Sequence, residues 1–215
     1  MITYEEKMTI KDLGARIISV WEGLRPMTRK MIVAALQNVS GTAGPANTTP
    51  NLSKSYSYDA HADWELSRLL TALDEQAMDP EVRKNPEKLA EIRRMAQTCA
   101  DVLYAQTESA EVFIQLAERA LRLQNYNQVD KLADMLADRF SVGEICEISR
   151  QTSNGAIRAL AQEALALMPI QALVPMLEDP LYSEIVRIAL EQQAYDYESE
   201  DAQELLDELD MEGNS

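Results

Sequence analysis

The residue types best suited to chemistry lie close together between Asp59 and Glu65, where two aspartates flank the only histidine of the chain. Carboxylates and an imidazole are suitable metal ligands, and Glu65 lies one helical turn beyond His61. Residues spaced by two lie on opposite faces of a helix, however, so Asp59, His61 and Asp63 would not converge on one ion. We therefore expect this segment to cap and begin a helix, and we expect neither a metal site nor a cofactor.

Motifs that support catalysis are missing from the sequence. It contains no glycine-rich phosphate loop, no Gly-x-Ser-x-Gly nucleophile motif and no second histidine. The lone histidine also excludes di-iron helical bundles, which use paired Glu-x-x-His motifs. Acidic residues number 36 of 215, so carboxylate pairs occur by chance on almost every helix. We predict no catalytic residues and a protein that is not an enzyme, with an enzyme built on two carboxylates and a bound metal as the open alternative.

The composition is typical of a soluble, helical, globular protein. The chain is 46% hydrophobic and 26% charged, and its seven glycines and two phenylalanines are little material for a sheet protein. No apolar run approaches the roughly 18 to 20 residues that span a bilayer. Residues 1–11 are charged without a signal-type apolar core, so we expect no membrane span and a cytoplasmic protein. Cys99 and Cys146 lie far apart among apolar neighbours, which predicts reduced core thiols.

Charge is distributed unevenly along this acidic chain. The formal net charge is −16 and the pI is about 4.5, which argues against general binding to a phosphate backbone. Residues 7–38 nevertheless have six basic and two acidic side chains, a net of +4. From Ile188 onward there is no basic residue, whereas ten are acidic. These ten are Glu191, Asp196, Glu198, Glu200, Asp201, Glu204, Asp207, Glu208, Asp210 and Glu212.

Apolar residues at steps of three and four predict a helix over 9–24, and Pro26 fits the first turn of a second helix that runs to about Val39. The sequence thus predicts a basic helical hairpin over 1–39, with Arg25, Arg29 and Lys30 as candidate binding residues. One hypothesis is contact with nucleic acid or an anionic membrane surface. We favour the alternative that the hairpin docks on the acidic remainder of the chain or on another copy, because no base-reading cluster of cations is visible.

Composition predicts three further segments. Residues 40–57 are rich in Gly, Pro, Ser, Thr and Asn, as in a flexible linker. Residues 58–194 hold successive apolar helical patterns, including one from Pro86 to about Gln106 that follows a short corner. Residues 195–215 form an acidic tail, for which a weak terminal helix, an interaction tail that orders on a basic partner, and a solubilising cap are open alternatives. A terminal helix would place Leu205, Leu209 and Met211 on one stripe.

A recurring pattern occupies residues 156–194. Ile157-Arg158 and Val186-Arg187 each begin an apolar helical run, they stand 29 residues apart, and an apolar segment that ends in Asp179-Pro180 separates them. Such a period is typical of stacked helical units. The stretch resembles HEAT-type repeats, in which an apolar run, an Asp-Pro corner and a Val-Arg helix start recur in this order. An ordinary antiparallel bundle is the alternative.

Residues 110–140 resemble one tetratricopeptide-type hairpin. Leu116-Ala117, Ala120, Asn125-Tyr126, Val129, Ala133 and Leu136 fall at the spacing of that repeat, and Gln124 stands where a glycine is usual. The two resemblances imply an all-α fold in which the N-terminal hairpin and the linker precede an α-solenoid-like array of antiparallel helical hairpins.

We expect a helical-repeat adaptor or scaffold that binds another protein with a basic surface. Candidate binding residues on the repeats are Arg158, Glu163, Glu184 and Arg187, although both arginines can instead bond carbonyls or acids of a neighbouring repeat. The alternatives are a regulator whose basic hairpin contacts nucleic acid, and a homo-oligomer in which that hairpin docks on the acidic tail of another copy. Given the net charge, we consider nucleic acid the less suitable partner.

Overall fold

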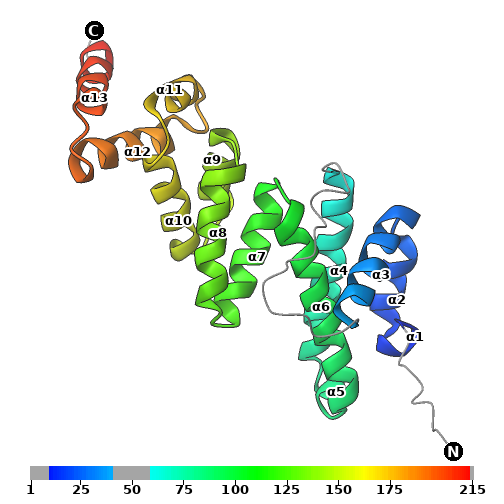
Figure 1. The fold of residues 1–215 in the computed structure, drawn as a ribbon. Helices are drawn as coiled ribbons and strands as arrows, with labels where there is room; N and C mark the ends of the chain where they lie inside the picture. Colours follow the sequence, from blue (N-terminus) through cyan, green and yellow to red (C-terminus); the bar gives the residue numbers. More distant parts are fainter. Residues whose placement is uncertain (1–9, 41–58, 214–215) are drawn as a thin grey trace, which may run out of the picture. The chain divides into compact units, whose positions relative to one another are not determined.

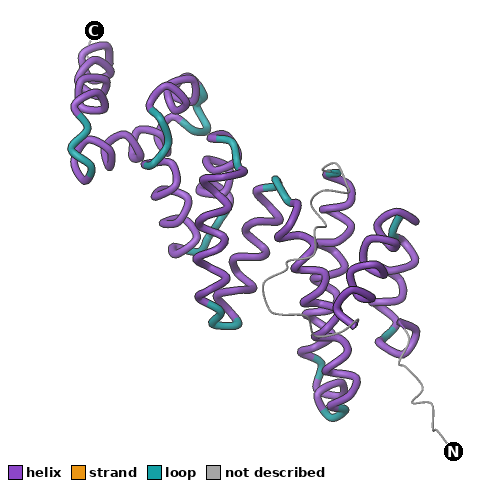
Figure 2. Tube along the Cα trace, in the orientation of Figure 1, coloured by secondary structure: helices purple, strands orange, loops and turns teal. Residues whose placement is uncertain are grey.

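The computed structural model describes residues 10–40 and 59–213, and every regular element in these two ranges is a helix (Figures 1 and 2). The predicted all-helical class is therefore confirmed for the described part of the chain. The predicted linker lies, apart from Ser40, outside the described residues.

The chain divides into two compact units, which we call unit 1 (Met1–Thr107) and unit 2 (Glu108–Ser215). The sequence instead predicts a boundary at residues 40–57. Helices on both sides of that segment pack together inside unit 1, with Ile17 and Ile32 fully buried there. A polar segment rich in Gly and Pro indicates a long connection, but it does not reveal whether the helices that it joins share a core.

Unit 1 is organised around α4 (Ala60–Met78) and α6 (Pro86–Gln106), the longest two helices of its described part, which pack on each other. Four leucines of α4 are buried, as are Ile92, Val102 and Leu103 of α6. The helices of unit 1 are α1 (Ile10–Leu13), α2 (Ala15–Gly23), α3 (Pro26–Ser40), α4 (Ala60–Met78), α5 (Pro80–Arg83) and α6 (Pro86–Gln106).

The single helix predicted over 9–24 is wrong, because Gly14 divides it into α1 and α2. Gly14 has φ +136°, a conformation that residues with a Cβ rarely adopt. A Cβ there would lie 2.9 Å from Oε1 of Gln76. The apolar periodicity continues across the break, which is why it did not reveal the change in direction.

The expected helix start at Asp59 is confirmed. The Asp59 side chain accepts hydrogen bonds from the backbone N–H of His61 and Ala62, at 2.9 and 3.3 Å. His61 is exposed whereas Asp63 is buried, so the two side chains lie on different faces of α4, as their spacing predicts.

In unit 2 each helix packs against helices close to it in the chain, among them α9 against α10, α10 against α12, and α12 against α13. The helices of unit 2 are α7 (Ala110–Arg122), α8 (Tyr126–Arg139), α9 (Val142–Gln151), α10 (Gly155–Ala166), α11 (Ile170–Leu173), the 3₁₀ helix η2 (Val174–Glu178), α12 (Ser183–Asp196) and α13 (Glu200–Gly213).

Local polar residues determine where several of these helices begin and end. Ser141 and Glu144 form a reciprocal capping box at the start of α9. The end of α7 is closed by bonds from Gln124 N to Leu121 O and from Asn125 N to Ala120 O, a Schellman motif. Gln124 therefore takes a left-handed conformation, with φ 54°, at the position where tetratricopeptide-type repeats usually have glycine.

The acidic end of the chain is helical. Helix α13 packs on α12 and buries Ala202 and Leu206. The predicted stripe of Leu205, Leu209 and Met211 is therefore wrong, since Met211 is exposed and the two leucines are only partly buried.

Within residues 10–40 and 59–213 no single helix is long and apolar enough to span a bilayer. The bent pair Gly155–Ala166 and Ile170–Glu178 has sufficient length and apolar character only when its two segments are taken together.

Candidate functional site

The two units differ strongly in charge. Unit 1 contains 13 basic and 14 acidic residues, a net of −1, whereas unit 2 contains seven basic and 22 acidic residues, a net of −15. Almost the entire net negative charge of the chain therefore belongs to unit 2.

Two of the predicted basic binding residues have partners inside unit 1. The Arg25 guanidinium donates to Asp59 at 2.9 Å and to Glu65 at 3.2 Å. Arg29 Nε donates to the backbone carbonyl of Leu24 at 2.9 Å, near the end of α2. Both guanidinium groups therefore join neighbouring elements of unit 1.

The ion pair with Arg25 also affects the ionisation of Asp59. Partial burial acts to raise the pKa of this carboxyl, but the hydrogen bond from Arg25 and those from His61 N and Ala62 N outweigh it. The pKa of Asp59 consequently lies below its ordinary value, and Asp59 stays ionised at neutral pH.

A third arginine of the hairpin also has a partner in unit 1. Arg16 pairs with Glu75 on α4 at 2.6 Å, while Lys30 is exposed on α3. Phosphate binding needs several available cations on one face. Among the basic side chains that the structure describes in residues 10–37, the three arginines are already engaged by acids or carbonyls.

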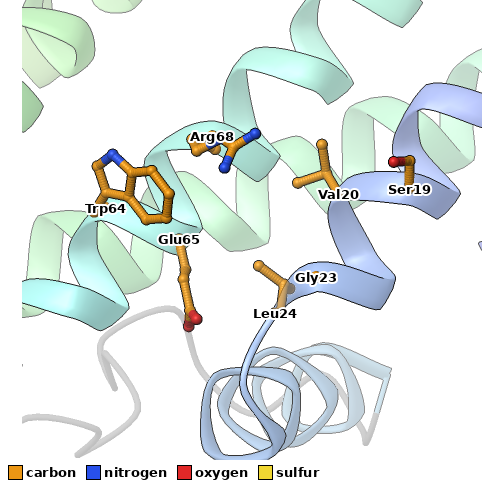
Figure 3. A pocket seen from close by; sticks show the side chains of 7 residues that line it. All are labelled: Ser19, Val20, Gly23, Leu24, Trp64, Glu65 and Arg68. Atoms are coloured by element: carbon orange, nitrogen blue, oxygen red, sulfur yellow. The ribbon is translucent and has the colours of Figure 1, made fainter.

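A small hollow lies between α2 and α4. Figure 3 shows Trp64 and Arg68 of α4 across from Val20, and the Arg68 guanidinium lies 4.7 Å from the centre of the Trp64 ring. The volume is about 110 Å³, which suits one side chain and is below the range of about 300 to 1,000 Å³ typical of small-molecule sites. The hollow is lined by Ser19, Val20, Gly23, Leu24, Trp64, Glu65 and Arg68.

Arg158, the first of the repeat residues singled out by sequence, stabilises the end of a helix. Its guanidinium donates to the backbone carbonyls of Thr152, at 2.6 Å, and Ser149, at 3.4 Å, both at the end of α9. A cation at a helix C-terminus satisfies carbonyls that lack intrahelical partners and interacts favourably with the helix dipole. Arg158 therefore bonds backbone carbonyls, which is the alternative that the sequence offered to a role in binding a partner.

Arg187 and Glu163 join α12 to its two neighbours. Arg187 donates to Asp210 of α13 and, at 3.4 Å, to Glu191 one turn further along α12. Glu163 of α10 accepts from Gln192 Nε2 at 2.8 Å and from the Tyr197 hydroxyl. The Glu163 hydrogen bond is the main cause that raises the pKa of Tyr197 above its ordinary value.

A row of exposed side chains on α12 lies between these two sets of bonds. We call Glu184, Ile188 and Tyr195 the α12 stripe, because steps of four and seven place them on one face of the helix. Ile188 is 43% and Tyr195 is 71% exposed. Since Arg187 lies toward α13 and Gln192 toward α10, the stripe runs between them. Glu191, three residues after Ile188 and four before Tyr195, lies on the same face between these two side chains.

The structure thus brings three of the predicted residues together around one helix face. Glu184 lies on the α12 stripe, while Glu163 and Arg187 mark its opposite borders. Sequence reasoning did not single out Ile188 and Tyr195, although an isoleucine and a tyrosine seven residues apart on an acidic helix were a visible signal.

No cluster of three or more His, Cys, Asp or Glu suitable for a metal ion occurs within residues 10–40 and 59–213. Comparison of the chain with protein-family models, with curated proteins and with solved structures finds no match in any of the three.

Proposed function

We propose that the protein is a non-enzymatic adaptor whose unit 2 binds a basic segment of another protein. The observation that carries this proposal is the charge of −15 on unit 2. Six acidic residues of α13 between Glu200 and Asp210 are exposed, and one of them, Asp210, pairs with Arg187. Like charge repels phosphate groups, which favours a basic polypeptide over nucleic acid or an anionic membrane.

We further propose that unit 2 is a short array of HEAT-like and tetratricopeptide-like helical repeats. Packing between elements close in sequence supports this, because each repeat of a solenoid contacts only its neighbours. The equivalent residues Ile157 and Val186 are both fully buried, as helix starts of stacked repeats would be. In such an array α13 would be the polar terminal element.

The alternatives that use the basic hairpin have less support. Contact with nucleic acid and docking on the acidic end of another copy both need cations that are available for a partner. Arg25 and Arg29 instead bond Asp59, Glu65 and the end of α2.

The test compares two full-length variants that lose the same charge at different places. The first replaces exposed acids of α13 (Glu204→Gln, Asp207→Asn, Glu208→Gln). The control replaces exposed acids of α7 and α8 in the same unit (Glu118→Gln, Asp134→Asn, Asp138→Asn).

Binding of each protein to poly-L-lysine is measured by calorimetry at 50 mM and 500 mM salt. Exposed ion pairs contribute about 0.5 kcal/mol each, so loss of three should weaken binding about tenfold in the α13 variant. High salt should remove most of the difference by screening. Equal weakening of both variants would show unspecific attraction to the acidic charge of unit 2 and would refute α13 as the binding surface.

A further inference from the structure

The α12 stripe exposes apolar side chains beside acidic ones, whereas a surface that binds through charge alone would need only the acidic ones. Ile188 and Tyr195 expose apolar area at 43% and 71%, and Glu184 continues the same face toward the start of the helix. From residue 184 to residue 195 the face extends about 16 Å, at 1.5 Å per residue. This length matches three turns of a second helix laid alongside.

The borders of the stripe indicate what such a helix must present. On one side Arg187 pairs with both Asp210 of α13 and Glu191, which leaves these three side chains a net charge of −1. On the other side Glu163 of α10 accepts hydrogen bonds only from the neutral side chains of Gln192 and Tyr197, so its negative charge is not paired with a cation by these bonds. A helix that seats two apolar side chains on Ile188 and Tyr195 would direct its flanking residues toward these acids. Lys or Arg at the flanks would be complementary in charge.

An extended peptide would fit less well. Extended segments are usually recognised by addition to the edge of a sheet, which offers unpaired N–H and C=O groups. The described residues of unit 2 form no strand, and the backbone of α12 is hydrogen-bonded within the helix. A helix face recognises a partner through side chains at helical spacing, which is what the stripe offers.

We propose that the α12 stripe is the docking site for one amphipathic helix of a partner protein, with apolar residues three or four apart and Lys or Arg on both flanks. This inference rests on the proposed function, since it names the form of the basic segment that unit 2 binds.

Two peptides of 18 residues test it, both made of the same numbers of leucine and lysine. In the first the leucines recur at i, i+3, i+4 and i+7, and in the second they are spread around the helix. Full-length protein is compared with the variant Ile188→Ser with Tyr195→Ser, and with a control variant Leu123→Ser with Tyr126→Ser. The control residues are apolar, 55% and 64% exposed, and lie around the turn between α7 and α8.

The amphipathic peptide should bind the unchanged protein at least about tenfold more tightly than the rearranged peptide, because it buries apolar area on Ile188 and Tyr195. The α12 variant should lose this preference while its circular dichroism is unchanged, and the control should keep it. If both peptides bind the unchanged protein equally and high salt abolishes both, the helix inference is overturned but the proposed function stands. If neither peptide binds, both are overturned.

Discussion

The Glu147 carboxylate fastens α9 to the turn that precedes α12, and its energy can be worked from its contacts. Arg150 donates to it twice, at 2.7 and 2.6 Å, and the Tyr182 hydroxyl donates at 3.0 Å. The bonds from Arg150 are the largest cause of a pKa of about 2, and those from Gln151 and Tyr182 add to them against the opposing effect of burial. Glu147 is thereby ionised at neutral and mildly acidic pH.

The substitution Glu147→Gln keeps the shape of the side chain and removes its charge. A hydrogen bond to a charged group contributes about 1.5 to 3 kcal/mol when buried, and an exposed ion pair about 0.2 to 1 kcal/mol. The Glu147 side chain is 22% exposed, so we expect a loss of about 1 to 2 kcal/mol in the free energy of unfolding at pH 7. Because the pKa is lower in the folded state, this contribution is complete above about pH 4.5 and disappears as the pH falls toward about 2.

Urea unfolding followed by far-ultraviolet circular dichroism measures the change. Both tryptophans, Trp21 and Trp64, lie in unit 1, so their fluorescence monitors that unit separately. Tyr182→Phe should lose about 1 kcal/mol, whereas Tyr126→Phe, on an exposed side chain, should lose nothing measurable. A Glu147→Gln effect below about 0.3 kcal/mol at pH 7, or one that grows on acidification, would refute this reasoning.

Three further substitutions test local features. Glu65→Ala should cost unit 1 about 2 to 4 kcal/mol in urea unfolding followed by fluorescence, because the backbone N–H of Arg25, its guanidinium and the Thr28 hydroxyl lose a buried acceptor. A loss under about 1 kcal/mol would contradict this role. Gly14→Ala should cost at least about 1 kcal/mol in the same assay, through its positive φ and the close Gln76 side chain, whereas Gly23→Ala, with no atom nearby, should not destabilise the protein. Gln124→Gly should leave the free energy of unfolding of unit 2 unchanged or raise it by up to about 1 kcal/mol, because glycine relieves the left-handed strain. The thermal midpoint of unit 2 should therefore stay the same or rise, and a lowered midpoint would contradict that explanation.

Features encoded within a few residues were predicted well. The helix from Pro86 to Gln106 and the cap at Asp59 each depend on neighbours in sequence, and the structure confirms both. Capping oxygens, prolines and apolar periodicity act over one or two turns, so a single sequence contains their whole cause.

Features that depend on distant residues were not predictable in this way. Arg25 meets Asp59 and Glu65 from positions 34 and 40 residues away, so its engagement in unit 1 is visible only after folding. The α12 stripe likewise depends on which faces of α12 are covered by α10 and α13. Helical periodicity identifies an apolar face, but it cannot tell which neighbour buries that face or leaves part of it exposed.

Hydrogen–deuterium exchange of the full-length protein, with and without the amphipathic leucine–lysine peptide, tests the central claim most directly. Binding to unit 2 at the α12 stripe predicts slower exchange of amides in residues 183–213, with residues 60–106 unchanged. Protection confined to residues 10–106 would place the partner on unit 1 and contradict the account.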